Sequence, residues 1–410
     1  MKRTQRNAHR FWLVLALTAA FGLGIAGSSE ARKAHWVAAW GFSIQGLAPT
    51  TATNETVRMI ARPTASGGFV RVRLENTFGT APLTIGAASI AYRNNGAQLV
   101  PGSSRPLTVG GSTSFTVAAG QGLYTDALPF AARAWEDLAV SLYLPGAAVQ
   151  ISRHNNARTT SFLTAAGAGD RTADETSVAF TGTTAEMYWV SAIDVFSEAE
   201  GAVVFFGDSI TDGTATTTDG HDRWHDVVYL RTLLGSKGDP RKAFVNEGIG
   251  GNRVTVTATQ GSPAAVERLD RDVLARSGIT HVVFFEGTND LASGLVNGDQ
   301  LIAGMTEIIR RVKHERLKIV GATIIPRSNA TWTPQMTAYR HQVNDWIRGR
   351  ADFDRVLDFD KVMLYPANPD VMNPILEFGD HIHPSPFGYL AIGRSVDLSV
   401  LEGEASDKDD

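Results

Sequence analysis

Alternating apolar and polar side chains characterise the first half of the chain. Residues 56–62 and 69–74 alternate in this way, and the clearest case is VRVRL at residues 70–74. Further short segments of this kind lie at residues 84–92, 114–117, 139–144 and 187–195, with glycine and proline between them. A period of two with turn residues between segments is typical of antiparallel strands that bury one face. We therefore predict an all-β sandwich, similar to a jelly roll, over residues 35–196.

The pattern changes after about residue 200, where apolar runs alternate with helical periodicity. The runs occupy residues 202–206, 243–245, 281–285, 319–325 and 356–359. Two segments between them place apolar residues on one helix face, namely Trp224, Val227, Val228 and Leu234, and then Leu301, Ile302, Met305, Ile308, Ile309 and Val312. Five buried strands alternating with helices predict an α/β domain with a parallel sheet covered on both faces, over residues 200–401.

The two ends of the chain differ from these halves. Residues 1–31 have the form of a secretory signal peptide, with a basic start, an apolar stretch at 11–27 and a cleavage site of the small-x-small form at 29–31. An uncleaved membrane anchor is the alternative, but the stretch is short and contains three glycines. We expect a secreted or periplasmic protein without stable membrane insertion after cleavage. The acidic tail at 402–410 is predicted to be disordered.

Composition excludes several classes of function. The 410 residues are 43% hydrophobic and 20% charged, as in globular proteins, and the formal net charge is -4. The chain has no basic stripe to follow a phosphate backbone, so we expect no nucleic-acid partner. There are no cysteines, which excludes disulfides and thiolate metal sites.

Polar residues and glycines follow the ends of three predicted strands. Ser209 ends the turn after the first strand, Gly250 and Gly251 follow the second, and Asn289 follows the third. Because the carboxyl ends of parallel strands meet at one edge of a sheet, these residues are expected to converge there. A fourth polar segment, GDHIHP at residues 379–384, stands near the C-terminus.

The chemistry of these groups is that of a serine hydrolase. A serine hydroxyl becomes a good nucleophile when an imidazole accepts its proton, and we expect His383 to take this role for Ser209. Asp380 would orient the imidazole, as in a Ser-His-Asp triad. An oxyanion formed at an ester carbonyl needs fixed donors, and we expect the backbone N–H groups of Ser209 and Gly251 with the side-chain amide of Asn289.

These residues resemble the conserved blocks of the SGNH superfamily of GDSL esterases and lipases. Ser209 matches the nucleophile of the first block, Gly251 the glycine of the second and Asn289 the asparagine of the third, while Asp380 and His383 match the terminal Asp-x-x-His-Pro block. The resemblance covers residues 202–401 and implies a flavodoxin-like, three-layer α/β/α domain that needs neither cofactor nor metal. Gly250 adjoins Gly251, so either glycine could be the second donor.

The resemblance also implies a reaction. We expect a secreted serine esterase that hydrolyses carboxylic esters through an acyl-enzyme intermediate. An all-β domain ahead of the hydrolase resembles secreted bacterial members that deacetylate plant polysaccharides, so short-acyl esters of carbohydrates, small or polymeric, are the first expectation. The alternatives are a lipase, lysophospholipase or aryl esterase, or a non-catalytic glycan-binding surface protein with a degenerate hydrolase domain.

Several other residues allow competing interpretations. Asp380, His381 and His383 would suit a metal ion, but a metal site there would leave Ser209, Gly251 and Asn289 unexplained. Asp208 and Asp290 are expected to fix turns through backbone hydrogen bonds.

The remaining candidates are loop residues and two further histidines. We expect His221 and His225 at the surface, with His221 near enough to line the cleft. The loop with Trp332 and Pro334 could shape a substrate pocket. In the first half, the polar stretch at 152–158 is the best candidate for ligand contact, with a solvated loop as the alternative.

Overall fold

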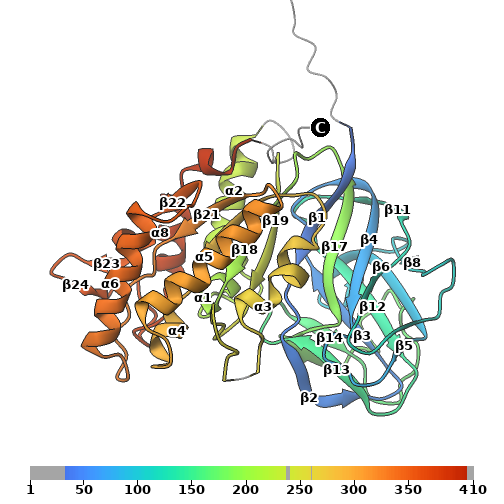
Figure 1. Cartoon of the computed structure of the whole chain (residues 1–410). Helices are drawn as coiled ribbons and strands as arrows, with labels where there is room; N and C mark the ends of the chain where they lie inside the picture. Colours follow the sequence, from blue (N-terminus) through green and yellow to red (C-terminus); the bar gives the residue numbers. More distant parts are fainter. Residues whose placement is uncertain (1–32, 237–240, 260, 404–410) are drawn as a thin grey trace, which may run out of the picture. The chain divides into compact units, whose positions relative to one another are not determined.

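The computed structural model describes residues 33–236, 241–259 and 261–403, and the first half of this chain is built from strands (Figure 1). These strands are β1 (His35–Gly41), β2 (Gly46–Ala52), β3 (Glu55–Ala61), β4 (Gly67–Glu75), β5 (Leu83–Ile85), β6 (Ala87–Asn95), β7 (Gln98–Leu99), β8 (Arg105–Pro106), β9 (Phe115–Val117), β10 (Gly122–Tyr124), β11 (Leu128–Ala132), β12 (Leu138–Leu144), β13 (Val149–His154), β14 (Ser161–Leu163), β15 (Gly182–Thr184), β16 (Met187–Tyr188) and β17 (Val190–Ser197). The all-β prediction is confirmed.

Two antiparallel sheets share a core in this half. One has the order β1-β17-β4-β10 with β11 beside β4, and the other has the order β15-β14-β3-β12-β6-β7 with β8 beside β6. Along β4, Val70, Val72 and Leu74 are buried in the core that they share with β3 and β12, as the alternation predicts. The predicted strand at 84–92 is divided between β5 and β6 at Gly86, where a Cβ would lie 2.7 Å from the ring of Tyr143.

The second half contains a parallel sheet, as predicted. Its five strands have the order β19-β18-β20-β21-β22, and every pairing between them is parallel. They are β18 (Ala202–Gly207), β19 (Ala243–Gly248), β20 (Ile279–Phe285), β21 (Lys318–Ala322) and β22 (Arg355–Leu357), and a separate hairpin is formed by β23 (Leu364–Tyr365) and β24 (Asn368–Met372).

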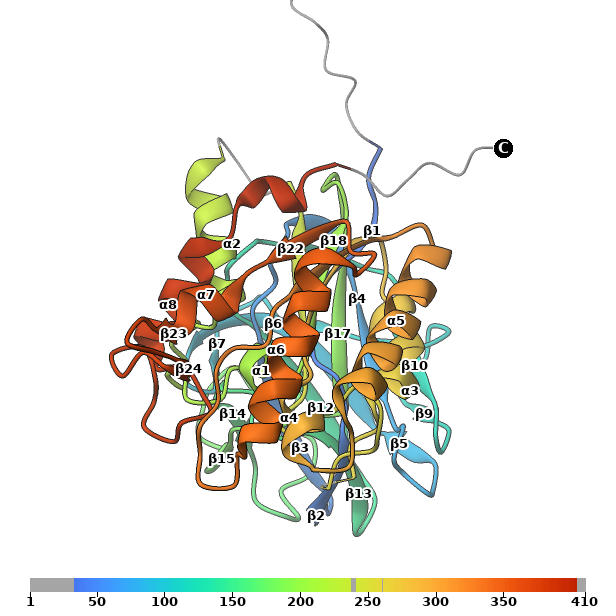
Figure 2. The ribbon, with the colours of Figure 1, turned by 60° about the vertical axis from the view of Figure 1, so that its left-hand side comes forward.

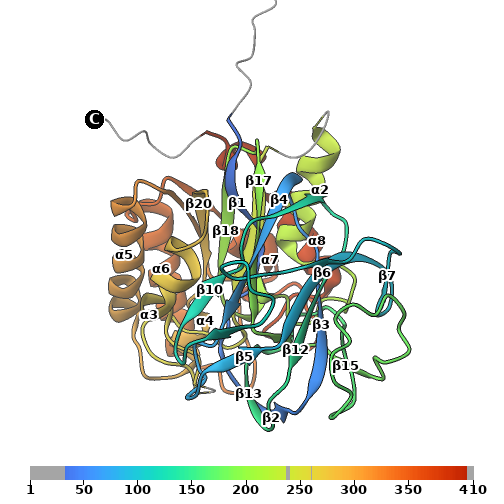
Figure 3. The ribbon, with the colours of Figure 1, turned by 90° about the vertical axis from the view of Figure 1, so that its right-hand side faces the viewer.

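Helices cover both faces of this sheet (Figure 3). They are α1 (Ser209–Asp212), α2 (Trp224–Gly235), α3 (Ala265–Leu269), α4 (Thr288–Ala292), α5 (Gly298–His314), α6 (Pro334–Gly349), α7 (Phe359–Met363) and α8 (Pro386–Ser395), with a π-helical turn at Asp270–Leu274 and a 3-10 turn at Leu398–Leu401. Figure 2 shows α5 and α6 side by side on one face. Successive residues of β18 point to opposite faces: Phe206 packs in the core with α5, and Phe205 packs against α2 and α8.

The two halves contact each other along the edge strand β19. The side chain of Thr64 exchanges hydrogen bonds with the backbone of Phe244, with the N–H of Phe244 2.7 Å away. A Cβ at Gly41 in β1 would lie 2.7 Å from Cγ1 of Val245, so only glycine allows this close approach. The residues from Ala34 onward form one compact unit, and the domain boundaries at 35–196 and 200–401 stay a prediction.

Two details differ from the sequence prediction. Leu234 was expected on the buried face of its helix but is 84% exposed, because it lies in the last turn of α2. The apolar run at 356–359 is not one strand, since β22 ends at Leu357 and α7 begins at Phe359.

The predicted signal peptide at 1–31 and residues 404–410 of the predicted tail lie outside the described residues. Within the part of the chain that is described, none of the helices has the length and apolar character that crossing a membrane requires.

Candidate active site

Ser209 lies at the start of α1, directly after the turn that follows β18. The backbone changes direction at Gly207, where a Cβ would lie only 2.3 Å from the carbonyl oxygen of Phe285. Asp208 is the N-cap of α1, and its carboxylate accepts a hydrogen bond of 2.9 Å from the N–H of Ile210. Ser209 is the first residue of the helix, so its own N–H has no partner within that helix.

The structure brings Ser209, His383 and Asp380 together. The hydroxyl of Ser209 lies 2.9 Å from Nε2 of His383, and Nδ1 of His383 lies 2.6 Å from Oδ2 of Asp380. The other oxygen of Asp380 accepts the backbone N–H groups of Ile382 and His383, at 2.9 and 2.8 Å. Burial alone would raise the pKa of Asp380, but the hydrogen bonds from His383 and Ile382 outweigh it and lower the pKa below the ordinary value.

The three predicted oxyanion donors, which belong to Ser209, Gly251 and Asn289, line one hollow of about 400 Å³ together with His383. Gly251 has the left-handed φ of 72° that favours glycine. The amide nitrogen of Asn289, in α4, donates to the carbonyl of Asn252 at 3.0 Å, and its oxygen accepts from Arg327 at 3.3 Å. The N–H of Gly250 donates to Oδ2 of Asp212 at 3.1 Å.

The first half of the chain supplies part of the same hollow. Gln45, Asn155 and Asn156 line it, and the side-chain oxygen of Gln45 accepts from the N–H of Asn155 at 3.1 Å. Both asparagines belong to the polar stretch at 152–158. Arg327, Thr214 and Asp212 also line the hollow, and sequence analysis had not singled them out. Each is an ordinary surface residue by type, and only the packing of distant segments brings it here.

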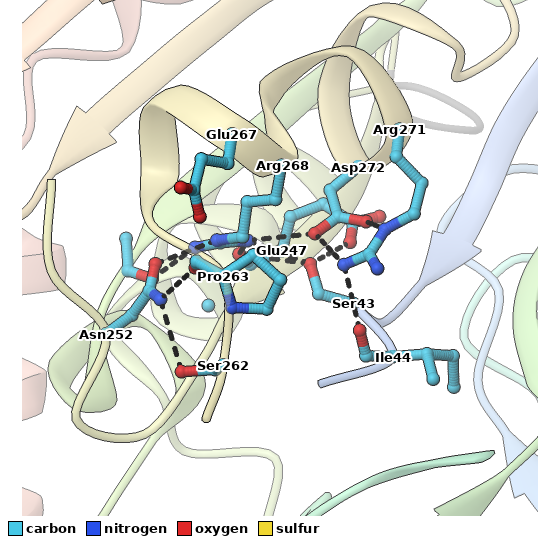
Figure 4. A network of polar contacts seen from close by, with 12 residues as sticks. Ser43, Ile44, Glu247, Asn252, Ser262, Pro263, Glu267, Arg268, Arg271 and Asp272 are labelled. Atoms are coloured by element: carbon cyan, nitrogen blue, oxygen red, sulfur yellow. Dashed lines mark hydrogen bonds and ion pairs between the residues drawn. The ribbon is translucent and has the colours of Figure 1, made fainter. Parts of the chain in front are cut away.

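A buried arginine connects the turns around the hollow (Figure 4). Arg268, in α3, is fully buried. Its guanidinium donates to the carbonyl oxygens of Gly207 and Glu247, at 2.9 and 2.8 Å, and to the side chain of Asn252 at 2.8 Å. It also reaches the hydroxyl of Ser43 in the first half, at 3.0 Å. One side chain therefore joins the ends of β18 and β19 to the sandwich.

Three carboxylates lie buried beside these turns. Asp208 caps its own helix, as expected, whereas Asp290 accepts the N–H groups of Val254 and Thr255 and so fixes the neighbouring loop. Glu286 has no hydrogen-bond partner for either oxygen among the described residues, and Arg268 lies 4.0 Å away. Burial raises the pKa of Glu286 well above its ordinary value and raises the pKa of Asp208 to about 7.

The raised pKa of Asp208 makes stability depend on pH. The folded state keeps this proton up to about pH 7, whereas the unfolded chain releases it near the ordinary value of 3.8, so unfolding becomes easier as pH rises between these values. Asp208→Asn retains an oxygen for the N–H of Ile210 and carries no titrating group. We expect the variant to exceed the wild type in unfolding free energy by about 2–4 kcal/mol at pH 8.

Urea unfolding at pH 5 and pH 8 measures this difference. At pH 5 the advantage of Asp208→Asn should fall to about 1–2 kcal/mol, because the folded wild type keeps its proton at this pH and only the unfolded chain has lost it. A variant that is less stable than the wild type at pH 8 would show that the ionised carboxylate is the stabilising form.

The histidines outside the triad have other partners. His225 was expected at the surface, and this is wrong: it is buried, its Nε2 lies 3.2 Å from the carbonyl of Thr211, and burial lowers its pKa to about 4. His221 lines a separate hollow with Trp135 rather than the one at Ser209. His381 lies 2.9 Å from Glu377, so the two imidazoles of the metal alternative contact different groups.

The loop after β21 contributes Arg327 to the hollow at Ser209, but not Trp332 or Pro334. Trp332 and Pro334 line a neighbouring hollow of about 470 Å³, and Arg327 lines both hollows. The prediction that this loop shapes a substrate pocket stays a prediction.

A comparison with known families finds a model that matches most of the second half of the chain. Residues 205–391 match the model of the GDSL-like Lipase/Acylhydrolase family. A comparison with curated proteins found no match.

Solved structures resemble the same half. A GDSL-like lipase from Bacteroides thetaiotaomicron is 21% identical over 49% of this chain and 88% of its own, with a TM-score of 0.37. A mutant of an acetyl-xylooligosaccharide esterase from Geobacillus Stearmophilus is 21% identical over 51% of this chain and 97% of its own, with a TM-score of 0.37. An α/β hydrolase from the metagenome of Lake Arreo is 19% identical over 49% and 95%, with a TM-score of 0.38.

Proposed function

From the premise that residues 205–391 form a GDSL-like lipase/acylhydrolase domain, and hence that the protein is a carboxylic ester hydrolase, we propose that it is an exported serine esterase acting on short-acyl esters of carbohydrates. The observation that carries the mechanism is the hydrogen-bonded series from the Ser209 hydroxyl through His383 to Asp380.

In the first step, the Ser209 oxygen attacks the ester carbonyl while Nε2 of His383 takes the hydroxyl proton. Asp380 accepts a hydrogen bond from Nδ1, which keeps Nε2 free to act as the base and stabilises the imidazolium that forms. The lowered pKa of Asp380 supports this role, because the carboxylate stays ionised across the neutral range.

The negative charge on the carbonyl oxygen is stabilised by donors that are already in place. The N–H of Ser209, at the start of α1, is the first, and the side-chain amide of Asn289 is another. Of the two glycines, Gly251 is the better second donor, because the N–H of Gly250 donates to Asp212. The hydrogen bond from Arg327 to the oxygen of Asn289 turns the amide nitrogen of Asn289 away from Arg327.

The intermediate then collapses and the alcohol leaves with the proton from His383. An acyl group remains on Ser209. Water enters, gives its proton to Nε2 of His383 and attacks the acyl carbonyl, and the same donors stabilise the second oxyanion. The carboxylic acid leaves and Ser209 regains its proton from His383.

The lining of the hollow supports a polar alcohol and a short acyl group. Amides from Gln45, Asn155 and Asn156, with the guanidinium of Arg327, can exchange hydrogen bonds with sugar hydroxyls. Among the described residues that line this hollow, Ile382 alone has an aliphatic side chain. The lining therefore offers little apolar surface to a long acyl chain. Export is supported by the signal-like pattern at residues 1–31.

A p-nitrophenyl ester series tests the substrate class. We expect kcat/KM to be highest for the acetate and to fall at least about tenfold by the octanoate, because a polar hollow gains nothing from added methylenes. Acetate release from acetylated xylan, with the Ser209→Ala protein as the blank, measures the carbohydrate reaction. A maximum at the octanoate or longer would favour a lipase, and no turnover of any ester would favour the glycan-binding alternative.

A further inference from the structure

A buried imidazole from the sandwich reaches the turn that carries Ser209. His154 is the last residue of β13, and its side chain is fully buried. Nδ1 lies 2.8 Å from the carbonyl oxygen of Ser43, and Nε2 lies 3.0 Å from Oδ1 of Asp212. A carbonyl and a carboxylate are both acceptors, so they suit the N–H groups that an imidazole ring offers. His154 therefore joins a loop of the first half to the last residue of α1.

Asp212 continues this series of hydrogen bonds to the glycine loop. While one oxygen accepts from His154, the other accepts the N–H of Gly250 at 3.1 Å. Asp212 stands three positions after Ser209, in the same helical turn, and its side chain is buried. Its carboxylate thus lies between the turn of the nucleophile and the loop of the expected second oxyanion donor.

The loop between Ile249 and Asn252 is a tight turn, in which the N–H of Asn252 donates to the carbonyl of Ile249 at 3.1 Å. Gly251 is at the third position of this turn in the left-handed conformation, and its N–H belongs to the peptide that joins it to Gly250. The N–H that Asp212 accepts belongs to the peptide before that one, between Ile249 and Gly250. A shift of the Asp212 carboxylate would therefore move the first of these two adjoining peptides, and the second, which carries the N–H of Gly251, would move with it.

We propose that His154 is a positioning residue, which holds Asp212 so that the Gly251 N–H faces the oxyanion. This inference rests on the proposed function and extends it, because it makes the sandwich a part of the catalytic centre. His154 touches neither the substrate nor the reacting atoms. Its effect is on the geometry of a donor, and loss of one such donor costs about 10²–10³ in kcat in a serine hydrolase.

Two substitutions separate this role from a structural one. His154→Gln can place an amide nitrogen near the position of Nε2 and so keep a donor for Asp212. His154→Asn can place one near the position of Nδ1 and so keep the donor to the Ser43 carbonyl only. With p-nitrophenyl acetate, we expect His154→Asn to lower kcat about 10- to 100-fold with KM changed less than about twofold. His154→Gln should stay within about fivefold of the wild type.

The proposal is overturned if kcat of His154→Asn equals or exceeds that of His154→Gln. If His154 only supports the loop at Ser43, His154→Asn should be the more active variant, or the two should be equal. A matched control is His281→Asn, which removes another fully buried imidazole from the far end of β20 and should leave kcat unchanged.

Asp212→Asn tests the same link from its other end. His154 and Gly250 contact different oxygens of Asp212, and asparagine has an NH2 group in place of one of them. One of the two hydrogen bonds is therefore lost, and we expect a fall in kcat of about tenfold or more. Should His154→Asn fail to fold, wild-type kcat in folded Asp212→Asn overturns the proposal. A wild type without Ser209-dependent activity overturns the proposed function, and this inference with it. An active wild type whose His154→Asn variant is equally active overturns this inference alone.

Discussion

Replacement of Ser209 by alanine is expected to lower kcat for p-nitrophenyl acetate by about 10³- to 10⁶-fold while the protein remains folded. The substitution removes one oxygen atom that forms a hydrogen bond to His383 and leaves the backbone donors of the site in place. Without the hydroxyl no acyl-enzyme forms, and only the oxyanion donors and substrate binding remain to assist water. Initial rates of p-nitrophenol release by the purified variant measure the residual activity.

A second substitution tests whether the triad acts as a unit. His383→Ala should reduce kcat by a similar factor, and the double variant should be no slower than either single one, because the members of a triad are strongly non-additive. Circular dichroism of each variant controls for folding. Activity in Ser209→Ala that matches the wild type would remove Ser209 from the mechanism, and additive losses would mean that the two residues act in separate steps.

Replacement of Arg268 by alanine should cause the largest loss of stability, about 3–5 kcal/mol of unfolding free energy. The guanidinium is completely buried, and its removal leaves the carbonyls of Gly207 and Glu247 without this donor. Figure 4 shows Arg268 beside Glu247 and Asn252. It also leaves the buried carboxylate of Asp272, 3.3 Å away, without one of its cationic neighbours. Each loss is costly because water does not replace the missing partner in a closed interior.

Urea unfolding monitored by tryptophan fluorescence measures this effect. Arg310→Ala is the control, since Arg310 pairs with Glu307 on the exposed side of α5 and its removal should leave the midpoint unchanged. Arg268→Lys should recover little, because an ammonium cannot reproduce the planar fork that reaches several acceptors at once. An unchanged midpoint in Arg268→Ala would mean that water enters the site and satisfies these groups.

Much of the fold can be predicted from the sequence, because the local periodicity of apolar residues indicates which side chains are buried. The alternation in residues 70–74 predicts a strand with one buried face, and β4 has this form. The runs before Ser209, Gly251 and Asn289 predict parallel strands, whose carboxyl ends share one edge. That rule alone brings the three residues to one hollow, although the sheet order needs tertiary contacts.

The partners of these residues are less predictable, because they depend on how the halves pack. His154 and Asp212 are 58 positions apart, and nothing in the spacing of either residue indicates the other. Arg268 has the type of a surface residue and is nevertheless fully buried, since five acceptors surround its guanidinium. His225 was misplaced for the same reason: a polar residue at the start of a helix is usually solvated, and here α1 and the sheet enclose it.

The close approach of Gly41 to Val245 also bears on how such a protein can change over generations. A larger side chain on either strand would be tolerated only together with a compensating change on the other, although more than 200 codons separate them. Recombination that exchanged one half for that of a distant relative would bring mismatched surfaces together along β19. The two halves are therefore expected to be inherited together, even though the proposed triad of Ser209, Asp380 and His383 lies in the second.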